Sequence, residues 1–276
     1  MTKNSVLTFR KKKKDGQKIT MLTAYDFTMA KLINDSGIDS VLVGDSLGNV
    51  MLGHEDTVSV TLDDMLSHCL AVSRACDKAM VVVDMPFMTY QVSVTETLHN
   101  AGRLMKEGRA NAVKLEGGTR VCPQIKALTE AGIPVMAHLG LTPQSINTFG
   151  GYKVVGKTKE TAEKLLAEAF AVQEAGAFAL VLECVPDKLS ELISKKLQIP
   201  TIGIGSGAGC DGQILVAQDM LGMTHGFSPK FVKVFAPVGD MIKTAISDYI
   251  KEVENGTYPN ETYSYPVGDE VLDKIY

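Results

Sequence analysis

Eight short apolar runs, rich in β-branched residues, recur along this chain, and segments with helical periodicity separate most of them. The runs are Ile19–Thr23, Ser40–Val43, Met80–Val83, Ala112–Leu115, Pro134–Ala137, Ala179–Leu182, Thr201–Ile204 and Phe231–Phe235. Continuous apolar runs of this length are typical of parallel strands buried on both faces of a sheet. Their alternation with helices predicts right-handed crossover connections. Eight such units in 276 residues favour a closed barrel over an open sheet, so we expect an α/β protein built as a single (β/α)8 TIM barrel.

Glycines mark the ends of the expected helices. Helical periodicity is clearest over Thr95–Lys106 and Thr158–Ala175. A glycine in the left-handed conformation just after a helix satisfies the last carbonyl groups of that helix. Four glycines stand at such positions: Gly37, Gly108, Gly132 and Gly176. No Pro- or Ser-rich linker interrupts the pattern, so we expect one domain over residues 1–276, with an irregular N-terminal segment and an irregular tail, Val253–Tyr276, that suits packing on a neighbouring subunit.

The charge and the cysteines limit the partners and the compartment. The net charge is −4 and the pI is about 5.8, so no basic field for nucleic acid pervades the chain. The basic run Lys11–Lys14 lacks aromatic or amphipathic context, and we interpret it as a solvated segment rather than an anion or membrane patch. Five cysteines without a CxxC pair predict reduced thiols. Without a signal-like apolar start or a membrane-length apolar stretch, we expect a cytoplasmic protein with no membrane partner.

Four acidic residues follow four of the predicted strands, directly or after one glycine: Asp45, Asp84, Glu116 and Glu183. The C-terminal ends of barrel strands carry the chemistry of this fold, so we expect the four carboxylates to meet at one rim. Such a set predicts an oxygen-ligand site for Mg²⁺, which keeps several waters and takes further oxygens from its substrate. Zinc is less suitable, because no pair of His or Cys stands at ligand spacing.

Three further residues at the same strand ends are candidates for substrate binding. The Ser46 hydroxyl and amide are suitable donors to a substrate carboxylate, although an Asp-Ser pair also suits a turn or helix cap. Lys114 precedes Glu116 by two residues and therefore shares its face, where it binds substrate or forms a structural ion pair. His138 is the histidine at a strand end, and we interpret it as a substrate hydrogen-bonder or a packed neighbour.

Glu183 is the candidate general base. It follows an apolar strand, and Cys184 beside it is better interpreted as a buried thiol than as a nucleophile, since no activating base adjoins it. The glycine-rich segment Gly203–Gly209 is a weak signal for a phosphate cradle or for close approach of a flat cofactor ring. Together, a hard metal, a lysine and an isolated base predict abstraction of a proton next to a carbonyl, with metal and lysine stabilising the enolate. A metal-chelating 2-oxo acid fits such a site.

The chain also resembles the ketopantoate hydroxymethyltransferase family from about Thr23 to Pro259. The motifs that carry this resemblance are Thr23–Asp26, Val43–Gly48, Asp84–Met88, Val113–Gly118, His138–Ser145, Gly150–Val154, Leu182–Pro186, Ile202–Gly205 and Asp211–Gln213. Three departures from the family pattern concern loop packing and folate affinity rather than the reaction: Thr57–Thr61, Ser67 and Ser206.

The resemblance implies a specific reaction and specific site residues. It implies a (β/α)8 barrel that transfers a hydroxymethyl group from 5,10-methylenetetrahydrofolate to 3-methyl-2-oxobutanoate, giving 2-dehydropantoate for coenzyme A biosynthesis through a Mg²⁺-stabilised enolate. It implies metal ligands at Asp45, Asp84 and Glu116, the last directly or through water, and a base at Glu183. The substrate contacts that it implies are Ser46 and Lys114, and we also expect Asp45, Asp84 and His138 to line the substrate site. It also implies a homodecamer of paired pentamers.

A Mg²⁺-dependent 2-oxo-acid lyase of the phosphoenolpyruvate mutase/isocitrate lyase type is the alternative function. Those enzymes similarly combine metal-binding acids with 2-oxo-acid enolates. They usually carry a catalytic loop of Lys-Lys-Cys-Gly type, which this chain lacks. A non-enzymatic scaffold would predict damaged rim acids, whereas all four are present.

Overall fold

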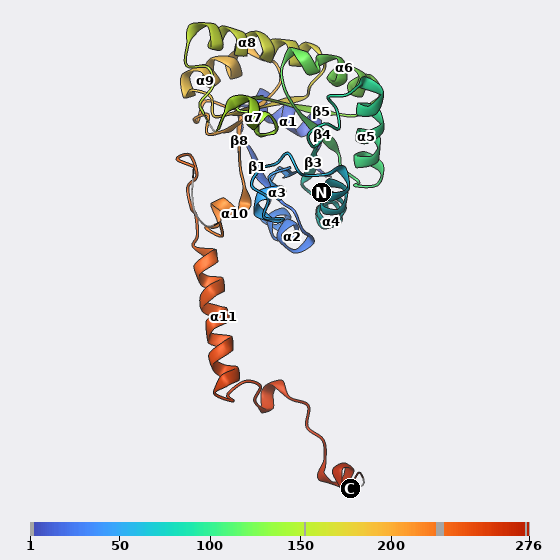
Figure 1. The fold of residues 1–276 in the computed structure, drawn as a ribbon, viewed down its shortest axis with the longest axis vertical. Coiled ribbons are helices and arrows are strands. Elements are labelled where there is room, and N and C mark those ends of the chain that lie inside the picture. Colours follow the sequence, from blue (N-terminus) through green and yellow to red (C-terminus); the bar gives the residue numbers. More distant parts are fainter. Residues whose placement is uncertain (1–2, 152, 225–228, 274, 276) are drawn as a thin grey trace. The chain divides into compact units, whose positions relative to one another are not determined.

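The structure, a computed structural model, describes residues 3–151, 153–224, 229–273 and 275 (Figure 1). Its strands are β1 (Ile19–Thr23), β2 (Ser40–Val43), β3 (Met80–Asp84), β4 (Ala112–Glu116), β5 (Val135–Gly140), β6 (Ala179–Glu183), β7 (Thr201–Ile204) and β8 (Gly212–Leu215). Its helices are α1 (Val6–Lys14), α2 (Phe27–Asp35), α3 (Leu47–Val50), α4 (Leu62–Ala75), α5 (Val94–Lys106), α6 (Cys122–Glu130), α7 (Ile146–Phe149), α8 (Lys159–Glu174), α9 (Asp187–Lys196), α10 (Ala217–Met220), α11 (Val238–Glu254) and α12 (Asp269–Leu272). Short 3₁₀ helices are η1 (Thr119–Val121), η2 (Pro143–Ser145) and η3 (Glu261–Tyr263).

The eight strands form one closed parallel barrel in chain order, and β8 pairs with β1 to close it. The expected (β/α)8 barrel is therefore confirmed. Seven strands coincide with the predicted runs to within a few residues. The eighth prediction is wrong, because Phe231–Phe235 lies in turn and irregular structure and the last strand is Gly212–Leu215. Phe231 packs instead against Gly205, where a Cβ atom would come within 2.7 Å of its ring.

The connection from β7 to β8 is a loop in place of a helix, and this is why the eighth strand follows so soon. The loop contains most of the glycine-rich segment. It packs on α9 so closely that a Cβ atom on Gly207 would lie 2.5 Å from Asp187, and one on Gly209 would lie 2.6 Å from Glu191. Packing on α9 thus accounts for these two glycines without a phosphate or a cofactor ring.

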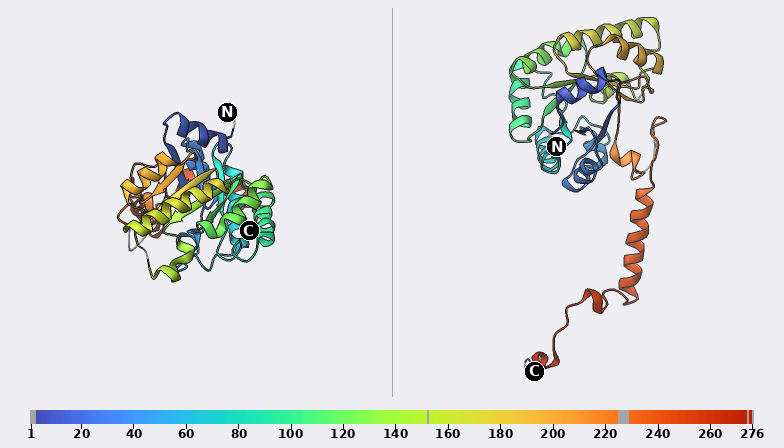
Figure 2. Two further views of the ribbon diagram at one scale, coloured as in Figure 1. Left: turned by 90° about the horizontal axis from the view of Figure 1, so that it is seen from above. Right: turned by 180° about the vertical axis from the view of Figure 1, so that it is seen from behind.

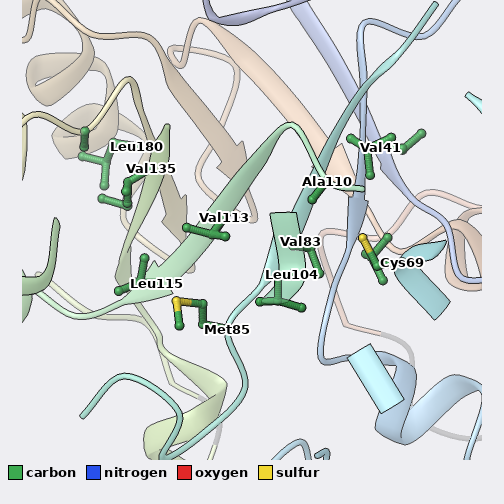
Figure 3. Packing of buried hydrophobic residues seen from close by; sticks show 14 of the residues in the cluster. Val41, Cys69, Val83, Met85, Leu104, Ala110, Val113, Leu115, Val135 and Leu180 are labelled. Carbon is green, nitrogen blue, oxygen red and sulfur yellow. The ribbon is translucent and has the colours of Figure 1, made fainter. Parts of the chain in front are cut away.

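Alternation along the strands divides the core into two layers. Residues facing outward, such as Val83, Val113 and Val135, pack against the surrounding helices in one large cluster (Figure 3). In Figure 3, Leu104 of α5 and Cys69 of α4 lie close to the outer face of the sheet. Inward-facing residues form a second cluster inside the barrel: Ile19, Met21, Leu42, Met80, Val82, Ala112, Met136, Ala179, Val181, Ile202 and Ile214.

Helix α1 covers the end of the barrel at which the strands begin (Figure 2). Its Phe9 is fully buried and meets Phe178 edge-to-face, with ring centroids 5.5 Å apart. Lys12 pairs with Asp39, which precedes β2, and Lys13 pairs with Asp211, which precedes β8. The prediction of an irregular N-terminal segment is therefore wrong over the described residues, because the lysines continue a helix. Lys11 and Lys14 are exposed, as expected for a solvated run, whereas Lys12 and Lys13 are half-buried in their ion pairs.

Three of the four predicted helix-ending glycines adopt the left-handed conformation, at φ values of 84°, 83° and 105°: Gly37, Gly132 and Gly176. The prediction for Gly108 is wrong. There the next residue, Arg109, takes the positive φ of 59°. Gly108 is needed for a different reason, because a Cβ atom would lie 2.6 Å from the Leu104 carbonyl oxygen.

The described residues divide into two compact units, of which the second contains α11 and α12. The first holds the barrel, up to Ala217 together with Pro229–Val232. In the second, α11 leaves apolar side chains exposed along its length: Met241, Ile242, Ile246, Tyr249, Ile250 and Val253. The expected irregular tail includes the short helix α12, and the single domain over 1–276 stays a prediction. No helix in the described ranges is long and apolar enough to cross a membrane.

Candidate active site

The strand register brings the predicted rim residues together. Asp84 on β3 stands opposite Lys114 on β4, and Glu116 two residues further stands opposite His138 on β5. Glu183 ends β6 opposite Gly140 at the end of β5. A parallel barrel gathers the ends of its strands at one rim, so side chains from four strands share one site.

Asp45 and Ser46 enter this site from the loop after β2. The Asp45 main-chain N–H donates to Asp84 Oδ2 at 3.1 Å, and the two carboxylates are close enough to repel each other. Ser46 occupies the position before α3, but its hydroxyl makes no capping bond there. It lies instead 2.8 Å from the hydroxyl of Tyr25, which is fully buried. Asp45 and Ser46 thus lie in a turn that leads into α3, as the alternative interpretation allows, but the Ser46 hydroxyl does not cap the helix and is held at the rim by Tyr25.

Lys114 lies at the centre of the acids and is buried with them. Its Nζ is 2.8 Å from Asp84 Oδ1 and 3.9 Å from Glu116 Oε1. Burial alone lowers the pKa of Lys114, but the carboxylates of Asp84, Glu116 and Asp45 outweigh it and raise that pKa above its usual value. The ammonium group is therefore a fixed positive charge, available to a bound anion as well as to its partner acids.

Lys114 does not neutralise all of the carboxylates around it. Burial, followed by repulsion from Asp84 and Glu116, raises the pKa of Asp45 well above its usual value. Burial also raises the pKa of Asp84. Burial pushes the pKa of Glu116 upward too, but His138 and Lys114 outweigh it, and that pKa is lowered. Two adjacent carboxylates that resist ionisation fit the chemistry of a hard divalent cation, which would supply the missing charge.

The acids do not form a closed cage for such a cation. Across the described residues, no three carboxylate, imidazole or thiolate groups converge closely enough to hold a metal ion between them. Mg²⁺ usually binds proteins through one or two carboxylates and completes its octahedron with water and substrate oxygens. The neighbouring pair Asp45 and Asp84 fits this mode.

His138 connects the candidate base to the acidic cluster. Its Nε2 lies 3.3 Å from Glu183 Oε2, and its Nδ1 lies 3.3 Å from Glu116 Oε1. Burial and the charge of Lys114 lower the pKa of His138, but the two glutamates outweigh them and raise it to about 9. His138 is thus a buried link between two carboxylates, and its two ring nitrogens already have charged neighbours.

Several contacts fix the chain around Glu183. Cys184 has a positive φ of 50°, a strained conformation for a residue with a side chain. Ser206, buried in the loop after β7, donates to the Leu182 carbonyl at 2.7 Å and accepts from the Val185 N–H at 3.2 Å. Its hydroxyl therefore connects the main chain before Glu183 to the main chain after it. Burial, and then the charge of Glu183, raise the pKa of Cys184 to about 11, so this thiol is neutral near pH 7.

Gln144 and Tyr90, to which the sequence analysis assigns no role, are central to the site. The Gln144 amide nitrogen donates to Asp45 Oδ2 at 2.8 Å and to the Met85 carbonyl at 3.0 Å. Its amide oxygen accepts from the Tyr90 hydroxyl at 2.7 Å. Gln144 lies within the motif His138–Ser145, but the residue type alone carries no signal of its partners.

This fold and site define the class of protein: a (β/α)8-barrel enzyme with a carboxylate-rich rim. The family model for ketopantoate hydroxymethyltransferase matches residues 3–261. The chain is 62% identical over 274 residues to a 3-methyl-2-oxobutanoate hydroxymethyltransferase of Clostridium novyi, covering 99% of this chain and all of that protein. It is 58% identical, with the same coverage, to the enzyme of that name from Enterococcus faecalis.

The chain therefore belongs to the ketopantoate hydroxymethyltransferase family. The expected activity, hydroxymethyl transfer in pantothenate biosynthesis, is thereby confirmed at the level of the family.

Two solved structures that share this fold come from distantly related proteins. A phosphonopyruvate hydrolase in complex with oxalate and Mg²⁺ superposes with a TM-score of 0.62 at 13% identity, covering 99% of this chain and 94% of that one. A 2,3-dimethylmalate lyase of the PEP mutase/isocitrate lyase superfamily gives a TM-score of 0.58 at 16% identity, with 99% and 98% coverage. These likenesses concern the barrel alone, and the alternative lyase function receives no support beyond it.

Proposed function

We propose that the chain transfers a hydroxymethyl group from 5,10-methylenetetrahydrofolate to 3-methyl-2-oxobutanoate, with water supplying the hydroxyl oxygen, to give 2-dehydropantoate. The family membership carries the reaction type and implies the folate donor. Glu183 removes the C3 proton of the oxo acid, and the enolate carbon then attacks the one-carbon unit of the donor. The Glu183–His138 contact of 3.3 Å is the observation that favours this role, because it holds the carboxylate at the rim, and among the described residues no lysine lies within ion-pair distance of Glu183.

The remaining rim residues bind and orient the oxo acid. Lys114 presents its ammonium group to the substrate oxygens, on which negative charge develops when the proton leaves. Ser46, held by Tyr25, donates to the substrate carboxylate. His138 keeps Glu183 in position and contacts the substrate side of the site. Lys114 and His138 are buried, which shields their charges from bulk solvent.

Mg²⁺ is the metal that suits this set of ligands. Asp45 and Asp84 would hold it directly, and Glu116, paired with His138, would reach it through water. When bound, the ion would supply positive charge to the oxygens of the oxo acid. Asp45 and Asp84 would therefore also lie beside the substrate, because the metal and the oxo acid would occupy the same site.

The assembly and the compartment follow from the same resemblance. We expect a homodecamer of paired pentamers, and the exposed apolar side of α11 suits a contact between copies. Small-molecule substrates are the expected ligands, without nucleic acid or membrane. We expect the enzyme in the cytoplasm, where a biosynthetic folate-dependent reaction finds its donor.

Exchange of the C3 proton of 3-methyl-2-oxobutanoate in D₂O, followed by NMR, tests the first half of the reaction without folate. We expect exchange that depends on Mg²⁺ and on the enzyme. Absence of exchange both without and with tetrahydrofolate, in folded protein supplied with metal, would refute the substrate assignment. Exchange of other 2-oxo acids alone would favour a lyase of the same barrel class.

A further inference from the structure

Gln144 joins the ends of four strands through its side-chain amide and its main-chain N–H. It lies in η2, directly after β5, and only 4% of its surface is exposed. Its two amide hydrogens point to Asp45 Oδ2, after β2, and to the Met85 carbonyl, after β3. Its main-chain N–H donates to Glu116 Oε2 at the end of β4, at 3.1 Å. One residue therefore contacts two of the three acids proposed to hold the metal.

The amide of Gln144 has one orientation that satisfies all of its neighbours. The Asp45 carboxylate and the Met85 carbonyl are acceptors, so both need the NH₂ group. On the opposite side, the Tyr90 hydroxyl accepts from the Glu116 main-chain N–H at 3.2 Å and donates to the amide oxygen. In the flipped orientation, the amide oxygen would face the Asp45 carboxylate, and neither group could donate a hydrogen bond. Asp45 and Met85 thus fix the orientation in which Gln144 donates to Asp45. The Tyr90 hydroxyl, which also lies 3.2 Å from the Glu116 carbonyl oxygen, stabilises that orientation by donating to the amide oxygen.

The bond from Gln144 reaches a buried carboxylate, Asp45, that has a second acid beside it. Asp45 is buried beside Asp84, whose Oδ2 accepts its main-chain N–H, and among the described residues no lysine lies within ion-pair distance of Asp45. A donated hydrogen bond fixes which carboxylate oxygen remains open for another ligand. With Oδ2 occupied by Gln144, Oδ1 is the oxygen available to a cation.

We propose that Gln144, locked by Tyr90, is a positioning residue that orients Asp45 for metal binding. The proposal rests on the proposed metal site and identifies what prepares it before metal arrives. Outer partners of metal ligands commonly change metal affinity by about 10- to 100-fold when they are removed. We expect an effect of that size here, because the same side chain also holds the loop after Asp84.

Gln144→Met tests the proposal, because it keeps the side-chain length and removes both donors. The matched control is Gln124→Met. Gln124 is also a buried glutamine, and it donates to the Tyr90 main-chain carbonyl at 3.3 Å. Among the described residues, it forms no hydrogen bond with any of the rim acids. Both variants lose one buried amide beside Tyr90, so a purely structural effect would appear in both.

The probe is Mn²⁺ alone, which shares the oxygen-ligand preference of Mg²⁺ and whose free ion is counted by EPR. We expect Gln144→Met to weaken Mn²⁺ binding about 10- to 100-fold and Gln124→Met to leave it within about threefold. Equal affinities of unaltered protein and Gln144→Met would overturn the positioning role and leave the metal site standing. No Mn²⁺ binding by unaltered protein would overturn both.

Tyr90→Phe keeps the proposal testable if Gln144→Met does not fold. It leaves the glutamine in place and removes the hydroxyl that donates to its amide oxygen and accepts from the Glu116 main-chain N–H. We expect a smaller loss of Mn²⁺ affinity in the same direction. Unchanged affinity in a folded Tyr90→Phe protein would refute the locking by Tyr90.

Discussion

Gly140→Ala is the sharpest perturbation of the proposed base that avoids the base itself. Gly140 ends β5 with a φ of 97°, a conformation that L side chains rarely adopt. A Cβ atom there would lie 2.2 Å from the Glu183 carbonyl oxygen and 2.8 Å from Val185 Cγ2. The first clash is with main chain, which no side-chain rotation relieves. The next residue, Leu141, donates to that same carbonyl at 2.9 Å, so the ends of β5 and β6 must separate.

The loss in free energy of unfolding that we expect for Gly140→Ala has two parts. The left-handed backbone conformation costs an alanine about 1–2 kcal/mol. Forcing two packed strand ends apart adds about 1–3 kcal/mol, the usual range for overpacking. Gly132→Ala separates the two, because Gly132 has a φ of 83° and no atom within 4 Å of its Cβ position. We therefore expect Gly132→Ala to lose only the first part of the stability.

The same displacement acts on activity. Glu183 pairs with Gly140 in the barrel, so a shift of β6 moves its carboxylate relative to the substrate. Misplacement of a reacting group by about 1 Å costs on the order of 10² in rate. We expect C3-proton exchange to fall by about that factor in Gly140→Ala and to stay near normal in Gly132→Ala, with urea unfolding measured in parallel. If both variants match in stability and exchange rate, the close approach of β5 and β6 does not position the base.

Four further outcomes are expected. Glu183→Gln should keep Mg²⁺ binding but cut turnover by on the order of 10² or more, and near-normal turnover would remove Glu183 from the mechanism. Asp84→Asn should weaken Mg²⁺ binding by calorimetry, and an unchanged affinity would contradict its role as a ligand. Phe9→Ala should destabilise the barrel by about 3–5 kcal/mol in denaturant unfolding, with little loss of exchange activity in the folded fraction. Alkylation of Cys184 should be slow at pH 7 and should accelerate as the pH rises towards about 11, since its raised pKa keeps the thiol protonated; rapid alkylation at pH 7 would show that the burial argument fails.

The barrel and its rim acids were predictable because burial on both faces leaves a strong local signal. A run such as Val81–Val83 has no room for polar residues, and the acid that follows it marks where the strand leaves the core. The last strand carries no such signal, because Gly212–Leu215 is short and Gln213 is exposed. Phe231–Phe235 has the stronger strand composition but finds no partner strand. Pairing with β7 and β1, rather than composition, therefore determines which of the two segments forms the eighth strand.

The supporting residues of the site were not predictable for a different reason. Gln144 is 99 positions from Asp45 in the chain, and Ser206 is 24 positions from the carbonyl of Leu182. Their roles exist only once the barrel has closed, since each bonds to a main-chain or carboxylate oxygen on another strand. The departure at Ser206 was expected to affect loop packing, and the structure adds that the loop concerned borders the candidate base.

The two-residue period of the strands separates stability from chemistry in this barrel. Val82, Ala112, Met136 and Val181 belong to the apolar interior, and the residue two positions further along each strand is a rim group: Asp84, Lys114, His138 and Glu183. Successive inward residues stack in layers, so the charged layer rests on an apolar one. Burying charges costs stability, and the apolar layer offsets that cost without touching the reaction. Substitutions in the apolar layer should therefore change unfolding more than metal affinity, and substitutions at the rim should do the reverse.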